Sequence, residues 1–446
     1  MQPSATRAKL PLIEVLPVHI AWPSIYCVTT LALWATAPFL RRVLDWKTHF
    51  SGISPLSALP LLMLVPAIIL IFTQRWRSIH RAFEIVVIFW MIGFCYALAV
   101  SFFANEFLGG LYTFVEFCLP LGFAYWIATR SERSYLWYQR MSATLIVLAV
   151  IISIYGIIQF VFVPPWDAAW MQELEIKAFG LPLPFQVRVF STLNSPATFA
   201  VFLTVATVMF LPRLTLRNGM LLLPIFIGLA LSLLRASWLS LPVGIIVFAA
   251  LTTRRKQLLT GVLTFLGIGV LTTVIASFLG ASDVGDKLAT RFSTLGDVSD
   301  DVSAQNRAGQ MADAFRTGIA DPEGSGLGFV GVSTRLNSAD ESATTLDSGF
   351  MSRFVEMGIP GSLALLISLG VAVSATARVW LESMQAGNHK KQDIAAVALA
   401  MQASMLALNL FGDYFSGAAG IVLWTSVALV LRGPLIERRP HLLAKR

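Results

Sequence analysis

The chain has 446 residues, of which 56% are hydrophobic and 13% are charged, and its mean hydropathy is +0.72. Because soluble domains carry about 25% charged residues, this composition excludes a water-soluble globule and predicts an all-α polytopic membrane protein of the inner-membrane type. A net charge of +8 would suggest nucleic-acid binding in a soluble protein. In a membrane protein, loop arginines that set the topology explain it, so we expect the lipid bilayer and no nucleic acid as a partner.

About a dozen apolar stretches approach the roughly 20 residues that a helical span needs. We place them at residues 20–40, 57–73, 82–103, 108–129, 141–163, 195–212, 219–233, 237–252, 258–280, 349–379, 394–411 and 417–432. Tight connections near Ser54 and Arg235 leave counts of eleven or thirteen open. The polar N-terminal segment is followed by an apolar run without a convincing cleavage site, so we expect a retained span and no signal peptide.

The lysines and arginines predict that both termini lie inside. In this arrangement most of the basic residues occupy cytoplasmic loops and most of the acidic residues face outward, which is the positive-inside pattern. Arg41, Arg42 and Lys47 fall on the outer side, against the trend.

The first outer segment, residues 164–190, predicts a short helix in the headgroup plane. Trp166, Trp170 and Leu174 recur at four-residue spacing and form one stripe. The alternative is a tryptophan anchor with no further role. The acidic residues off the stripe are Asp167, Glu173 and Glu175.

The second outer segment, residues 281–346, is a long hydrophilic loop. Residues 303–319 predict a helix within it, ended by Asp321-Pro322, and four glycines then turn the chain back toward the membrane. A long loop with its own helix is more often functional than a spacer. The expected apolar face of the loop helix consists of Ala304, Ala308, Met311, Ala312 and Phe315.

These features divide the chain into five parts. They are residues 1–163 with spans one to five, 164–190 as an interfacial segment, 191–280 with spans six to nine, 281–348 as the large outer loop, and 349–446 with spans ten to twelve and a cytoplasmic tail.

Four residues of the outer face are candidates for chemistry: Arg188, Arg235, Arg307 and Asp347. An arginine at the edge of the hydrocarbon core is costly unless it is paired or hydrated. Arg235 is the sharpest case because its neighbours are almost wholly apolar. Several arginines at a membrane surface suit a diphosphate, since guanidinium binds phosphate oxygens through two parallel hydrogen bonds.

Each candidate also has a simpler interpretation. Arg235 could snorkel to the interface, and Arg188 could pair with Glu173 or Glu175. Arg307 could be a solvated helix residue, and Asp347 could cap the helix that follows it.

A general base on the outer side is expected to be a carboxylate. Of the five histidines, only His49 faces outward in this topology, and no P-loop, GxSxG motif or metal-ligand spacing occurs. Asp347 is the best placed, with Glu356 one helical stretch deeper as a second candidate for the substrate site. The three cysteines all fall within predicted spans and are expected to be small core residues without a metal or disulfide framework. They are Cys27, Cys95 and Cys118.

Four stretches together resemble the superfamily of O-antigen ligases and Wzy-type polysaccharide polymerases of bacterial inner membranes. They are RVFSTLNSPATFAVFL (188–203), LSLLRASWLS (231–240), AQNRAGQMADAFRTGIADPEGSGLGF (304–329) and DSGFMSRFVEMGIPG (347–361). The resemblance covers roughly residues 185–380. It rests on the order in which these motifs follow one another and on their predicted outer location.

The resemblance implies a helical fold of the kind seen in GT-C-like glycosyltransferases, with about twelve spans and a large periplasmic loop. It implies transfer of a glycan from undecaprenyl diphosphate to an acceptor hydroxyl on the periplasmic face, with inversion and without metal or cofactor. Arg235 and Arg307 would hold the donor diphosphate, with Arg188 close by. In the ligases a histidine usually occupies the position of Asp347.

Three functions stay open. The first is a polymerase of lipid-linked repeat units, which the missing histidine favours and which would allow a chain-length regulator as a partner. The second is a ligase that moves the glycan to lipid A–core or another acceptor. The third is a lipid-linked oligosaccharide transporter. A midplane charge, Glu116, is consistent with transport, whereas the sequence lacks the clear internal repeat that many transporters have.

Overall fold

The structure, a computed structural model, describes residues 22–49, 55–73, 79–130, 134–174, 179–252, 302–331, 333–334 and 346–432. These residues form an all-α fold with two isolated β-bridges. The predicted span at 258–280, the basic residues at 254–256 and the start of the outer loop lie outside the described residues.

Every predicted span within the described residues falls on helical structure, although the one at 57–73 is divided into short helices. The long helices are α1 (Trp22–Thr48), α4 (Arg81–Phe103), α5 (Phe107–Thr129), α6 (Ser134–Phe162), α8 (Pro196–Phe210), α15 (Gly349–Gln385) and α16 (His389–Asn409). The shorter elements are η1 (Pro55–Ala58), α2 (Leu59–Leu62), α3 (Val65–Thr73), α7 (Pro165–Leu174), η3 (Leu211–Arg213), α9 (Leu216–Gly219), α10 (Leu222–Ser232), α11 (Arg235–Leu251), α14 (Val302–Ala320) and α17 (Gly417–Val430). Within the described part of the chain, six helices are long and apolar enough to cross a bilayer, so the chain is a multi-pass membrane protein.

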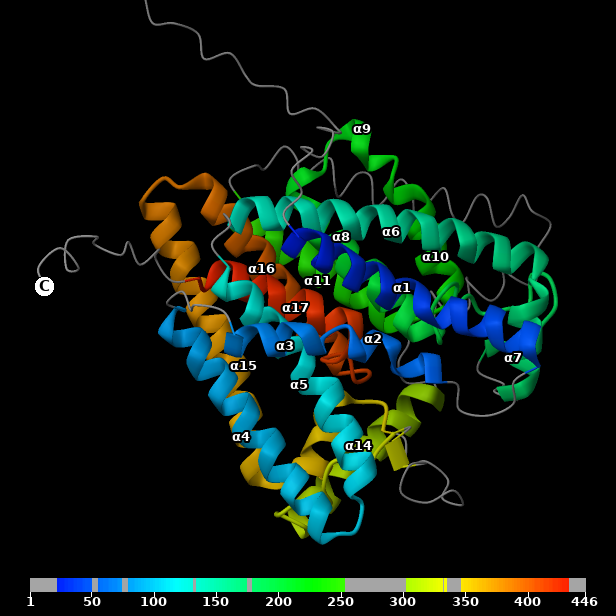
Figure 1. The fold of residues 1–446 in the computed structure, drawn as a ribbon, viewed down its shortest axis with the longest axis horizontal. Helices are drawn as coiled ribbons and strands as arrows, with labels where there is room; N and C mark the ends of the chain where they lie inside the picture. The colour runs from blue at the N-terminus through cyan, green and yellow to red at the C-terminus, as the bar shows by residue number, and fades with distance from the viewer. Residues whose placement is uncertain are drawn as a thin grey trace, which may run out of the picture.

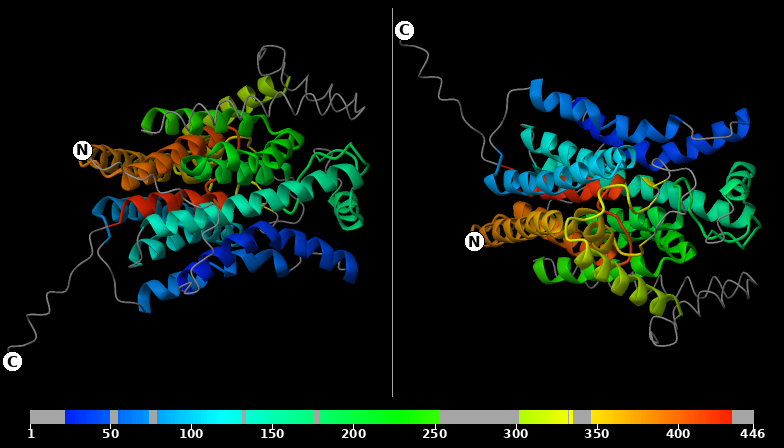
Figure 2. Two further views of the ribbon diagram at one scale, coloured as in Figure 1. Left: turned by 90° about the horizontal axis from the view of Figure 1, so that it is seen from above. Right: turned by 90° about the horizontal axis from the view of Figure 1, so that it is seen from below.

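The helices lie side by side in a bundle with α17 in its middle (Figures 1 and 2). Helix α15 runs along α4, α11 along α16, and α17 along α5. Small residues permit the close α4–α15 contact: a Cβ atom at Gly93 would lie 2.9 Å from the carbonyl oxygen of Gly361. Such close backbone approach is typical of helix pairs in membranes.

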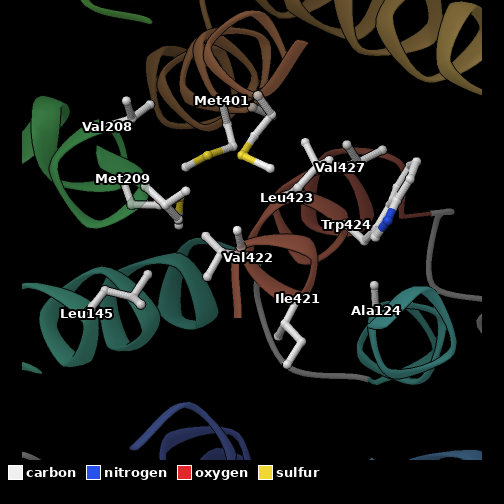
Figure 3. Close-up of a cluster of buried hydrophobic side chains, with 14 of the residues drawn as sticks. Ala124, Leu145, Val208, Met209, Met401, Ile421, Val422, Leu423, Trp424 and Val427 are labelled. Carbon is white, nitrogen blue, oxygen red and sulfur yellow. The ribbon is translucent and has the colours of Figure 1, made fainter. Parts of the chain in front are cut away.

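Helix α17 is buried on all sides. Every residue from Ala419 to Val430 is buried, and Figure 3 shows its side chains among those of α5, α6, α8 and α16. A helix that is apolar around its whole circumference is expected in such a position. The bundle therefore has a central helix that the surrounding helices separate from lipid.

Helix α15 bends where its own hydrogen bonds fail. Pro360 has no N–H to donate to Glu356, and Gly358 has a positive φ of 59°. The segment after α14 replaces the missing bonds: the Gly326 N–H donates to the Glu356 carbonyl oxygen at 2.9 Å, and the Ile359 N–H donates to the Pro322 carbonyl oxygen at 2.9 Å. The outer loop is thus hydrogen-bonded into the bend of a spanning helix.

The loop helix exists as predicted, and it packs on α15 through small residues and an aromatic pair. Helix α14 covers Val302–Ala320, and Ala314 and Gly318 are its buried residues among those whose side chains are described. Met311 and Phe315 of the predicted apolar face are 37% and 53% exposed. The Phe315 ring nevertheless stacks on Phe354 of α15, with ring centroids 5.9 Å apart, and Phe354 also approaches Gly318 so closely that a Cβ atom there would clash.

The cysteine prediction holds for two of the three residues. Cys27 and Cys118 are buried, whereas Cys95 is exposed on α4. All three are free thiols.

Candidate functional site

The structure brings Arg188 to the turn that carries Arg235. Helix α10 ends at Leu233, which adopts the left-handed conformation with φ 54°, and Arg235 is the first residue of α11. The Arg188 guanidinium donates from Nε to the Ser232 carbonyl oxygen at 2.6 Å and from Nη2 to the Leu233 carbonyl oxygen at 3.3 Å. Arg188 therefore binds the C-terminal carbonyls of α10, where a cation is favoured, two residues from Arg235.

The segment that follows Arg188 is held by a buried ion pair. Arg42 Nε lies 2.9 Å from Asp167 Oδ1, and both side chains are 0% exposed. Arg42 also donates from Nη1 to the Leu193 carbonyl oxygen at 2.6 Å and from Nη2 to the Ser191 carbonyl oxygen. Arg42 lies within α1 rather than in a loop, so its departure from the positive-inside pattern has a structural reason.

Helix α6 completes this buried network. Asp167 Oδ2 accepts from Tyr155 and from Gln159, each at 2.7 Å. Gln159 Oε1 in turn accepts from the backbone N–H groups of Phe190 and Ser191, at 3.1 and 2.8 Å. A buried charge is stable only when it is paired and hydrogen-bonded, and here these bonds fix the 190–193 backbone.

Helix α7 is docked on the bundle both through its tryptophans and through Asp167, which lies off the tryptophan stripe. Asp167 is fully buried, and the Trp166 indole N–H donates to the Tyr155 hydroxyl at 2.7 Å. The Trp170 ring stacks on Phe179. The segment therefore forms a short helix as predicted, but its tryptophans contact protein side chains, next to the end of α1 (Figure 1).

Asp347 does not cap the next helix. The N-cap of α15 is Ser348, whose Oγ accepts from the Met351 N–H at 3.5 Å, so the capping interpretation of Asp347 is wrong. Asp347 is exposed and lies at the start of α15, where the Gly349 N–H donates to the Gly412 carbonyl oxygen at 3.1 Å. This contact sets Asp347 beside the segment that joins α16 to α17.

Glu356 belongs to a buried charge cluster that the sequence did not indicate. Arg353 Nη1 lies 2.5 Å from Glu356 Oε2, and Arg353 Nη2 lies 3.0 Å from Asp413 Oδ2. Glu356 Oε1 also accepts from the N–H groups of Gly328 and Val330, at 2.9 and 3.0 Å. Binding of substrate by Glu356 stays a prediction. Together, Glu356 and Arg353 join α15 to the glycine-rich segment and to the α16–α17 connection.

Asp413 could not be found from local sequence, because its partner Arg353 is distant along the chain. Burial raises the pKa of the Asp413 carboxyl above its usual value, and the charge of Arg353 opposes this shift. The Asp413 side chain is 23% exposed, so this carboxyl reaches the edge of a cavity.

A cavity of about 240 Å³ opens between α1, α5, the start of α8 and the α16–α17 connection. Its lining combines aromatic rings, carboxylates, hydroxyls and an amide. The polar residues that line it are Arg41, Tyr112, Glu116, Asn194, Thr198, Asp413, Tyr414 and Ser416. Leu193 and Asn194 place the cavity next to the segment that begins with Arg188.

The segments that carry Arg188, Arg235 and Asp347 are connected to one another around this cavity. The Val189 N–H donates to the Leu231 carbonyl oxygen at 3.2 Å, which joins the α10–α11 turn to the segment before α8. That segment lines the cavity, and the α16–α17 connection lines it too and contacts the start of α15. Arg307 lies in α14, and the position of its side chain is outside the described residues. Among the described residues, no group of three His, Cys, Asp or Glu lies close enough to hold a metal ion.

Comparison with protein families matches residues 220–366 to the model described as O-antigen ligase. This range confirms the predicted resemblance, and it contains Arg235, Arg307, Asp347 and Glu356. Comparison with curated proteins gave no match.

Proposed function

We propose that the chain is a glycosyltransferase that polymerises undecaprenyl-diphosphate-linked oligosaccharide repeat units on the periplasmic face of a bacterial inner membrane. The observation that carries the proposal is the O-antigen ligase match over residues 220–366, together with the two arginines at the α10–α11 turn. Arg188 and Arg235 lie there on neighbouring backbone. Family membership supports a lipid-linked glycan as substrate.

In this proposal the arginines stabilise the leaving group. The acceptor hydroxyl oxygen bonds to the anomeric carbon of the donor sugar, and the bond from that carbon to the diphosphate oxygen breaks. Undecaprenyl diphosphate then leaves with the bonding electron pair. Fixed guanidinium groups of Arg235 and Arg307 neutralise the charge that develops on it, with Arg188 next to them, and such preorganised charge is often the largest single catalytic effect.

Asp347 is the proposed base. It is exposed at the start of α15, and Ser348 rather than Asp347 is the N-cap of that helix. A carboxylate within hydrogen-bond reach of the acceptor hydroxyl can accept its proton as a general base.

A ligase that transfers the glycan to lipid A–core is the second candidate, because the matched family carries that description. The two functions differ only in the acceptor. An aspartate at position 347 in place of the usual ligase histidine favours the polymerase.

The test is reconstitution of the purified protein with undecaprenyl-diphosphate oligosaccharide as the sole glycan, in EDTA, with product length read on a gel. A ladder of repeat multiples supports a metal-independent polymerase. Transfer only to added lipid A–core would make the chain a ligase. No transfer to either acceptor would contradict both functions and favour transport of the lipid-linked oligosaccharide.

A further inference from the structure

We propose that the cavity between α1, α5, α8 and the α16–α17 connection is a saccharide subsite that holds the acceptor end of the glycan. This inference rests on the proposed function for the role of the bound sugar, but the binding itself can be measured without it. The cavity contains none of the arginines assigned to the diphosphate, and its volume of about 240 Å³ has the scale of one or two sugar rings.

The polar groups of the cavity match a neutral polyhydroxyl ligand. Glu116 and Asp413 are acceptors when ionised, whereas Asn194 both donates and accepts. Sugar hydroxyls do both, so they can satisfy these groups together. The Ser416 hydroxyl already donates to Glu116 Oε1 at 3.1 Å, which fixes that carboxylate with its second oxygen available for a ligand.

Aromatic rings supply the apolar part of such a site. Trp34 and Tyr414 line the cavity from α1 and the α16–α17 connection, and Tyr112 lines it from α5. Pockets for small molecules typically combine apolar and aromatic walls with a few placed polar groups, and the C–H faces of a sugar ring pack on such walls while its hydroxyls reach the polar groups.

The charges argue against a diphosphate in the cavity. The nearby guanidinium groups already have carboxylate partners: Arg353 contacts Asp413 at 3.0 Å, and Arg41 lies 3.8 Å from Asp45. Glu116 adds a further carboxyl group to the wall. A phosphate would meet like charge there, whereas the turn of Arg188 and Arg235 offers cations.

The entrance fits an acceptor that arrives from the same side as the donor. Asn194 and Thr198 are exposed and lie at the start of α8, six and ten residues after Arg188. A glycan in the cavity could therefore extend toward the arginine turn, with the hydroxyl to be glycosylated nearest to the donor.

Two probes separate this subsite from the diphosphate site. The first is the free oligosaccharide released by mild acid from the undecaprenyl-linked pool of the host bacterium, and the second is undecaprenyl diphosphate without sugar. Binding of each to the full chain in lipid nanodiscs is measured by calorimetry. We expect Glu116→Gln to weaken oligosaccharide binding at least ten-fold and to leave binding of undecaprenyl diphosphate unchanged. Arg235→Ala should do the reverse.

Thr198→Phe is a second, independent test in case the Glu116 variant fails to fold. It adds volume at the exposed entrance of the cavity and removes no buried group. We expect the same loss of oligosaccharide binding. Matched controls are Glu382→Gln and Ser374→Phe, exposed positions on the far part of α15, which should bind both probes as the parent chain does.

The outcomes distinguish the two levels of inference. Oligosaccharide binding that is lost in Glu116→Gln and Thr198→Phe, in a chain that transfers no glycan, would support the subsite and contradict the proposed function. Normal glycan transfer with parent-like oligosaccharide affinity in both variants would overturn the subsite alone. Absence of oligosaccharide binding to the parent chain would also overturn it.

Discussion

At the scale of single residues, the arginines assigned from sequence differ in their surroundings. Arg188 donates hydrogen bonds to two backbone carbonyl oxygens. The sequence offered two interpretations of it, binding of the diphosphate or pairing with an acidic residue of the first outer segment. Sequence could mark Arg235 because a cation among apolar residues is conspicuous. It could not mark Arg353 or Asp413, because their pairing arises only when α15 meets the α16–α17 connection.

Arg235→Ala and Arg307→Ala are each expected to abolish glycan transfer, because the developing charge on the diphosphate loses a fixed counter-charge. The measurement is product formation from undecaprenyl-diphosphate oligosaccharide by folded, purified variants. Arg316→Ala is the matched control, since Arg316 lies on α14 with 81% of its side chain exposed. Full activity in either arginine variant would remove that residue from the site.

Asp347→Asn is expected to reduce transfer at least 100-fold without changing the melting temperature, since general base catalysis contributes about 10²- to 10⁴-fold. Ser348→Ala, in contrast, should cost about 1 kcal/mol of stability through loss of the N-cap. Transfer rate and thermal unfolding are measured on both variants. Parent-like transfer in Asp347→Asn would contradict the role of the base.

We expect the buried Arg42–Asp167 ion pair to contribute to the stability of the fold. Asp167→Ala leaves the Arg42 charge buried without its partner and is expected to destabilise the protein by about 3–5 kcal/mol. Thermal unfolding in detergent checks this, with Asp313→Ala as the control because Asp313 pairs with Arg316 at 3.5 Å on the exposed surface. Equal melting temperatures for the two variants would show that the buried pair contributes no more than the exposed one.

At the scale of elements, hydropathy located the helices because each span needs an apolar stretch of bilayer length. It could not locate the bend of α15 or the burial of α14, since both depend on contacts between segments. Only Pro360 signals the bend locally. The hydrogen bonds of the 322–326 segment to the Val355–Ile359 backbone exist because the outer loop folds back onto that place.

Gly358→Ala tests the contact between loop and helix. A Cβ atom there would lie 2.4 Å from the Pro322 carbonyl oxygen, in a residue with φ of 59°, so we expect a loss of at least about 1–3 kcal/mol from the strained backbone alone. Gly370→Ala is the control on the same helix. It has open space around its Cβ position and should gain up to about 1 kcal/mol. The melting temperatures of the two variants test this, and a Gly358→Ala variant as stable as Gly370→Ala would contradict the prediction.

At the scale of the whole molecule, the distribution of lysine and arginine predicts which end of the bundle is periplasmic. Single cysteines at Asn105 and Ala386, in a chain without its own cysteines, report on the α4–α5 and α15–α16 turns. An impermeant maleimide is expected to label Asn105→Cys in intact cells and Ala386→Cys only after the membrane is opened. The opposite labelling would place the candidate site in the cytoplasm and contradict the proposed use of a periplasmic donor.

The central position of α17 has a consequence for biogenesis. A chain grows from its N-terminus, so α17 is synthesised after α5, α6, α8 and α16, which enclose it. These helices must therefore leave a vacant slot among themselves until α17 arrives, or separate again to admit it. With only 14 residues, α17 is also short for a lipid-exposed span. Its entry into the membrane is thus expected to depend on reception by the earlier helices, and release from the insertion machinery would coincide with closure of the bundle.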